Sequence, residues 1–125
     1  MQRYFADGVE LGPLLKAPAV IYGWDDKLHE IYLMRCFKKL PFSPTCYFVP
    51  HIVAMKTMVL ESLAYALLPK QMVAEELKKS ILTEVLAGKN LAVNLYWHYS
   101  EAAHPVLRPF TQALVSFAGQ VLERW

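Results

Sequence analysis

Short apolar runs that alternate with helix-forming stretches constrain the fold of this 125-residue chain more than any other feature. Residues 19–22 and 46–49 are continuous apolar or aromatic runs, which are typical of strands buried on both faces. A third run covers residues 64–68 and ends at Pro69. Helical patterns separate these runs. The order therefore predicts an α/β architecture in which right-handed crossovers connect parallel strands.

The last segment has the clearest helical periodicity. Its apolar residues recur at alternating spacings of three and four: Leu107, Phe110, Leu114, Phe117 and Val121. This spacing places them on one face of a helix. Further helices are predicted over 52–62 and 71–79, with Met72, Val73 and Leu77 of the latter facing inward.

Asp25 and Asp26 precede another helical pattern and suit the positive end of a helix. The apolar face predicted for that helix carries Leu28, Ile31, Tyr32, Cys36 and Leu40. Residues 1–13 are predicted to be irregular, because Gly12 and Pro13 are breakers, with a short helical turn over 14–17. Additional strands are expected over 82–86 and 91–98.

Composition narrows the class of protein. Hydrophobic residues make up 55% of the chain, but no apolar run reaches the roughly 18 residues that a membrane helix needs. The net charge of +2 comes from scattered basic residues and does not argue for a nucleic-acid partner. The N-terminus has no signal-peptide pattern. Cys36 and Cys46 lack metal or redox spacing. We therefore expect a cytoplasmic protein with two free thiols and no membrane association.

Two turns are candidates for ligand binding, because open α/β sheets bind ligands beyond the carboxyl ends of their strands. The first runs from Tyr22 to Asp26, with His29 one helical turn later, and the second is residues 49–51. Asp25 or Asp26 can pair with the cationic end of a ligand, or both can serve only as helix caps. His51 can donate to a ligand or simply face solvent.

Other chemistry is not indicated. His98 and His104 have no cysteine or acid at ligand spacing, so no metal site is expected. Ser100 lacks the surroundings of a hydrolase nucleophile, and no glycine-rich phosphate loop is present. We expect no cofactor, no catalytic residue and no enzymatic activity, although a small enzyme that uses the unassigned histidines is a third alternative.

Four stretches in combination identify a family. They are Leu14-Leu15-Lys16-Ala17-Pro18-Ala19-Val20 with Asp26 and His29, then Tyr65-Ala66-Leu67-Leu68-Pro69, then Leu95-Tyr96-Trp97-His98, then His104-Pro105-Val106-Leu107-Arg108-Pro109-Phe110. Their order and spacing resemble the C-terminal part of the effector-binding domain of LysR-type transcriptional regulators. The resemblance is to the arginine- and lysine-responsive branch, also described as chromosome-initiation inhibitors.

The resemblance implies a periplasmic-binding-protein-like α/β fold with two lobes joined by crossing strands. Residues 1–86 would form most of the second lobe. Residues 87–125 would supply the crossing strand and the C-terminal helix of the first lobe. The DNA-binding part of such regulators would lie outside these residues, so we expect no direct DNA binding by this chain alone.

The function implied by the resemblance is that of an effector-sensing and oligomerisation fragment of a transcriptional regulator. The effector would be a small molecule, lysine or arginine, held by Tyr22, Asp25, Asp26, His29 and His51. The sequence departs from the family at Pro50 to Val53, where small polar residues are usual. It also has Ser62 and Ala64 in place of a glycine pair, which would keep close packing but not an unusual backbone angle.

Assembly is the main alternative function. The apolar excess is consistent with a homo-oligomer, or with an interaction module that binds no small molecule at all. Ligand titration separates these two functions, because a change of oligomeric state without any ligand favours the interaction module.

Overall fold

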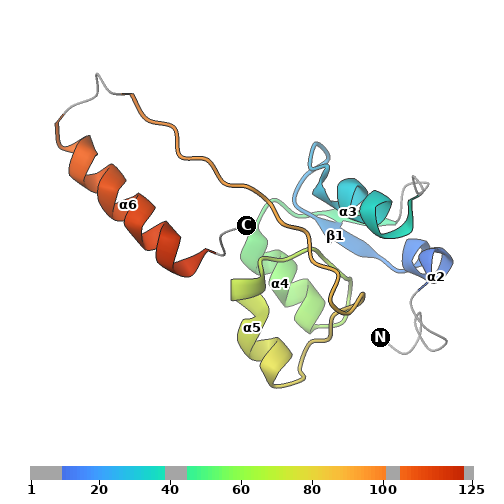
Figure 1. Cartoon of the computed structure of the whole chain (residues 1–125). Helices are drawn as coiled ribbons and strands as arrows, with labels where there is room; N and C mark the ends of the chain where they lie inside the picture. The colour runs from blue at the N-terminus through green and yellow to red at the C-terminus, as the bar shows by residue number, and fades with distance from the viewer. Residues whose placement is uncertain (1–9, 39–44, 101–104, 123–125) are drawn as a thin grey trace. The chain divides into compact units, whose positions relative to one another are not determined.

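The computed structural model describes residues 10–38, 45–100 and 105–122 (Figure 1). The chain divides into one compact unit over Met1–Leu91 and a second over Ala92–Trp125, and each is described by itself. His104 and Leu40, which entered the sequence-based predictions, lie outside the described residues.

A short parallel sheet forms the centre of the first unit. Strand β1 (Ala19–Ile21) pairs with β2 (Cys46–Phe48), and Val20 lies opposite Tyr47. All of β1 is buried, as its continuous apolar sequence predicts. On its other edge β1 meets Tyr65, whose N–H donates to the Pro18 carbonyl at 3.0 Å. The predicted strand over 64–68 is thus reduced to a single parallel bridge at Tyr65.

Three helices of the first unit follow the sequence closely. Helix α3 spans Leu28–Phe37, α4 spans Ile52–Leu60 and α5 spans Lys70–Lys78. The predicted inward residue Val73 is buried on α5. The fully buried side chains of the described core are Leu14, Val20 and Leu33.

The face predicted for α3 was wrong at Leu28 and Ile31, although Tyr32 and Cys36 are half-buried as predicted. The helix buries His29 and Leu33, whereas Leu28 and Ile31 are 39% and 49% exposed. The buried face of α3 therefore includes a histidine. The side chain can be buried there because the Tyr65 hydroxyl, 3.1 Å away, is its hydrogen-bond partner. Apolar counting alone cannot identify such a face, since it treats histidine as polar.

Helix α2 (Leu11–Lys16) begins earlier than the predicted turn over 14–17. Gly12 and Pro13 lie inside it, so the prediction that they break the chain was wrong. Proline is tolerated here because Pro13 lies in the first turn, where backbone N–H groups have no partner within the helix. Leu14 then lies on the buried side of α2 and is 1% exposed.

Helix α4 ends in a strained turn. Ser62 has a φ of 59°, in the left-handed region, and the Leu63 N–H donates to the Met58 carbonyl at 2.9 Å. The expectation that Ser62 would not adopt an unusual angle was wrong. The turn fixes the backbone so firmly that a residue with a Cβ is held in a conformation that favours glycine.

Residues 82–86, predicted as a strand, form bends and irregular backbone, and a turn follows at 87–88. The segment is held locally: the Glu84 carboxylate accepts the Gly88 N–H at 2.9 Å, and Gly88 has a φ of 71°. The Tyr32 hydroxyl on α3 donates to the Lys89 carbonyl at 2.8 Å. These bonds replace the predicted ladder.

The second unit contains an extended segment and helix α6 (Leu107–Val121), drawn in orange and red (Figure 1). The helix confirms the periodicity prediction. Residues 91–98 were predicted to be a strand, but they form no ladder with any part of the chain that the structure describes. Within residues 10–38, 45–100 and 105–122, no helix has the length and apolar character required to traverse a lipid bilayer.

Candidate functional site

The turn after β1 is compact and polar. The Asp26 N–H donates to the Gly23 carbonyl at 3.1 Å, and the Asp26 carboxylate accepts the Leu28 N–H at 2.9 Å. A Cβ on Gly23 would lie 2.9 Å from Oδ1 of Asp25, so a larger residue there would displace the exposed Asp25 carboxylate. Tyr22 and Asp25 are exposed. The Asp26 carboxylate therefore satisfies the first N–H of α3, whose N-cap residue is Lys27, and Asp25 presents a carboxylate to solvent.

The turn after β2 places His51 at the N-terminus of α4. Its Nδ1 accepts the Ala54 N–H at 3.2 Å. When the ring is neutral, its proton must therefore lie on Nε2, which leaves an exposed donor. In the described part of the chain, no acceptor is found for the N–H groups of Ile52 and Val53. Together with the positive end of the helix dipole, these groups favour an anion at this position.

The two turns lie side by side at the carboxyl end of the sheet, which is the edge at which both strands finish. Strands β1 and β2 are parallel and adjacent, so both end at this edge. The Val49 N–H donates to the Ile21 carbonyl at 2.9 Å and ties the two strand ends together. Neighbouring strands lie about 4.8 Å apart, so both turns start within reach of one small ligand. One side of this edge offers carboxylates and the other offers N–H donors.

His29 lies below this edge rather than on it. The residue is 4% exposed, and its Nε2 lies 3.1 Å from the Tyr65 hydroxyl. The two rings are tilted, with centroids 5.3 Å apart. Burial lowers the pKa of His29, and the carboxylates of Asp26 and Glu30 oppose part of that shift. Burial also raises the pKa of Tyr65. The pair is therefore neutral and links α3 to the segment that bridges β1.

The structure thus brings Tyr22, Asp25, Asp26 and His51 to a shared edge and places His29 in the core beneath it. Sequence reasoning did not identify the free N–H groups that begin α4, because backbone donors carry no residue signature. Tyr65 belongs to one of the stretches that resemble the family, but its pairing with His29 was not predicted. A separation of 36 residues conceals that contact from any local pattern.

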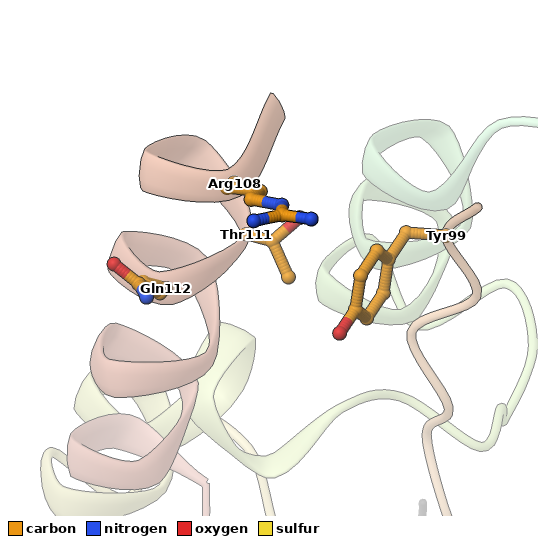
Figure 2. Close-up of a pocket in the computed structure, with 4 residues that line it drawn as sticks. All are labelled: Tyr99, Arg108, Thr111 and Gln112. Atoms are coloured by element: carbon orange, nitrogen blue, oxygen red, sulfur yellow. The ribbon is translucent and has the colours of Figure 1, made fainter. Parts of the chain in front are cut away.

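Two open pockets lie elsewhere in the described residues. One of about 360 Å³ in the first unit is lined by residues between Leu77 and Ala87, including Glu84. Another of about 250 Å³ in the second unit is lined by Tyr99, Arg108, Thr111 and Gln112 (Figure 2). The described residues contain no group of three or more histidine, cysteine or acidic side chains placed to hold a metal ion.

Comparisons with known proteins agree with the sequence-based resemblance. No family model matches the chain. The transcriptional regulator ArgP of Vibrio parahaemolyticus is 34% identical over 117 residues, which cover 94% of this chain and 39% of that protein. ArgP of Proteus mirabilis is 32% identical over 123 residues, which cover 98% of this chain and 41% of that protein. The chain thus spans about two fifths of the length of these curated relatives.

Solved structures extend the comparison to the fold. The C-terminal domains of a LysR family protein from Agrobacterium tumefaciens superpose with a TM-score of 0.93 at 29% identity, covering 100% of this chain and 60% of that one. ArgP from Mycobacterium tuberculosis gives a TM-score of 0.78 at 21% identity, over 94% of this chain and 40% of that one, and supports the fold alone. The predicted α/β effector-domain fold is confirmed. The relatives are named as transcriptional regulators, not enzymes.

Proposed function

Since this chain is homologous to the C-terminal part of LysR-type transcriptional regulators, we propose that it is the effector-sensing part of such a regulator and binds a basic amino acid, lysine or arginine. The observation that carries the proposal is the parallel pairing of β1 with β2, which brings the turn at Asp25 and Asp26 beside the turn at His51. A basic amino acid has one anionic and one cationic end. This edge of the sheet offers a partner for each.

The cationic end is assigned to the β1–α3 turn. Asp25 is exposed and has no cap to satisfy, whereas Asp26 keeps one oxygen on the Leu28 N–H and has a second available. A carboxylate–ammonium or carboxylate–guanidinium hydrogen bond is roughly twice as strong as a neutral one. The half-exposed ring of Tyr22 can cover the aliphatic part of the ligand.

The α-carboxylate is assigned to the start of α4. The N–H groups of Ile52 and Val53 have no acceptor among the described residues, and Nε2–H of His51 is a third donor. Pro50 supplies no N–H, so His51 takes the place of the small polar residues that are usual in the family. His29 does not touch the ligand. It acts as a positioning residue that holds α3 against Tyr65.

Thermal unfolding with lysine or arginine tests the proposal. A ligand that binds only the native state raises the melting temperature by mass action. We expect Asp26→Asn to remove much of that rise, because asparagine keeps the oxygen that caps α3 but loses the charge. Glu75→Gln on exposed α5 is the matched control and should leave the rise unchanged. No rise with millimolar lysine or arginine would contradict the proposal.

The same proposal predicts that the chain alone does not recognise an operator. The net charge is +2, so any DNA binding should be weak, sensitive to salt and indifferent to sequence. A sequence-specific footprint at physiological salt, produced by this chain alone, would contradict it.

A further inference from the structure

The chain turns sharply where helix α5 ends (Figure 1). The N–H groups of Ile81 and Leu82 both donate to the Glu76 carbonyl, at 2.9 and 3.2 Å. Ser80 has a φ of 56°, in the left-handed region that commonly ends a helix. Residues 81–87 therefore fold back beside the last turn of α5 instead of continuing along its axis.

An open pocket of about 360 Å³ lies between the last turn of α5 and the segment that follows it. Its lining has an apolar part, made of three aliphatic side chains, and a polar part, made of two hydroxyls and one carboxylate. The apolar residues are Leu77, Leu82 and Ala87, and the polar ones are Ser80, Thr83 and Glu84. One continuous stretch of the first unit thus forms the pocket, which combines a single negative charge with a short apolar surface.

The Glu84 carboxylate is held in place but is not neutralised. Its Oε2 accepts the Gly88 N–H at 2.9 Å, and this bond fixes the carboxylate against the turn at 87–88. No lysine or arginine among the described residues forms an ion pair with Glu84. The second oxygen, Oε1, can therefore accept a hydrogen bond from a ligand.

The end of α5 adds a partial negative charge. The last four carbonyls of a helix have no partner within it, and the dipole places roughly half a negative charge at this end. The turn uses the Glu76 carbonyl, but no described N–H donates to the carbonyls of Lys78 and Lys79. The Lys79 ammonium pairs with Glu75 at 3.7 Å. The carbonyls and Glu84 together favour a cation in the pocket.

The lining offers nothing that suits a carboxylate. None of its residues is a lysine, an arginine or a histidine. The α-carboxylate of a free amino acid would meet the Glu84 carboxylate and the negative end of α5, and like charges repel. The pocket therefore disfavours a zwitterionic amino acid and accepts a cation that has no carboxylate.

We propose that this pocket is a second ligand site, which binds a small aliphatic amine or diamine without a carboxylate. The ammonium binds Oε1 of Glu84 and the hydroxyls of Ser80 and Thr83. The methylene chain lies on Leu77 and Leu82, as the stems of long cationic side chains lie on apolar surfaces. A diaminopentane takes roughly 200 Å³ if each non-hydrogen atom takes about the 30 Å³ of a water molecule, so it fits. The site is separate from the turns after β1 and β2 and does not rest on the proposed function.

A matched pair of ligands tests the proposal, because lysine and 1,5-diaminopentane differ only in the α-carboxylate. Each is titrated into the ¹⁵N-labelled full chain at constant ionic strength, and amide shifts are followed by NMR. We expect diaminopentane to give saturable shifts at the amides of Ser80, Thr83, Glu84 and Ala87. At these amides it should bind at least about threefold more tightly than lysine, since exposed charge contacts contribute up to about fivefold in affinity.

Glu84→Gln isolates the charge, because glutamine keeps an oxygen for the Gly88 N–H. We expect it to weaken diaminopentane binding at least about threefold. Glu75→Gln removes an exposed carboxylate from α5 outside the pocket and is the matched control, so it should leave the affinity unchanged. Asp26→Asn should also leave the diaminopentane shifts unchanged, because that residue belongs to the β1–α3 turn.

Three outcomes would overturn the proposal. They are no saturable shift at residues 80–87 with millimolar diaminopentane, equally tight binding of lysine there, and an equal loss of affinity in Glu75→Gln and Glu84→Gln. If Glu84→Gln does not fold, the comparison of the two ligands on the unaltered chain still decides. Lysine shifts at Gly23 to Asp26 are read in the same spectra and test the proposed function separately, so the failure of one site is distinguishable from the failure of the other.

Discussion

Removing the hydroxyl of Tyr65 tests how the core beneath the binding edge is held. Tyr65→Phe keeps the ring but leaves Nε2 of His29, a residue 4% exposed, without its partner at 3.1 Å. A buried polar atom left unsatisfied costs about 1–3 kcal/mol. Tyr32→Phe is the matched control. It removes a phenol bond to the exposed Lys89 carbonyl, which water can replace, so it should cost less than about 1 kcal/mol.

The double substitution separates pairing from packing. His29→Leu leaves the Tyr65 hydroxyl unpaired and should cost a similar amount, whereas His29→Leu with Tyr65→Phe replaces both polar groups by apolar ones. We therefore expect the double variant to be about 1–2 kcal/mol more stable than the sum of the single costs predicts. Urea unfolding at pH 7.5 or so measures each free energy. Additivity within about 0.5 kcal/mol would show that the hydroxyl and the imidazole do not stabilise each other.

Other predictions concern pH, strain and the link between α4 and α5. Burial lowers the pKa of His29 from its ordinary 6.5, so stability is full above 6.5 and falls as the pH drops through the native pKa. His29→Gln should flatten that slope in urea midpoints, and an unchanged slope would contradict the assignment. Ser62→Gly should stabilise the fold by about 1 kcal/mol, because the φ of Ser62 is 59° and glycine adopts that angle without strain. Ser116→Gly inside α6 is the control and should lower the melting temperature, because glycine is a poor helix former. The Lys56 Nζ lies 2.6 Å from a carboxylate oxygen of Glu76 and lowers the pKa of that carboxyl. Lys56→Met should therefore lower the urea midpoint near neutral pH. The decrease in midpoint should be smaller at acid pH, where Glu76 is protonated. The same difference at acid pH would exclude a role for the charge.

Local patterns were sufficient for most elements of the fold. Strand β1, helix α5 and helix α6 lie where their apolar periodicity placed them. The missing strands have a physical explanation, because a ladder requires a partner that no local pattern specifies. Residues 92–99 have the alternation of a strand, but they form no ladder with any described residue.

The candidate site was predictable only in outline. The turns after β1 and β2 could be located because ligand sites follow the carboxyl ends of parallel strands. The separate roles of the side chains depend on contacts across the fold. The buried state of His29 follows from Tyr65, and the free Nε2–H of His51 follows from its bond to Ala54. Neither contact leaves a signature in the residues around it.

The central claim is that a basic amino acid binds where β1 and β2 end, and an NMR titration of the ¹⁵N-labelled chain with lysine or arginine tests it most directly. We expect saturable amide shifts that are largest at Gly23 to Asp26 and at His51 to Val53, since those backbone groups line both halves of the proposed site. The shifts should be strongly reduced in Asp26→Asn. Saturable shifts centred elsewhere, or none at millimolar ligand, would contradict the claim.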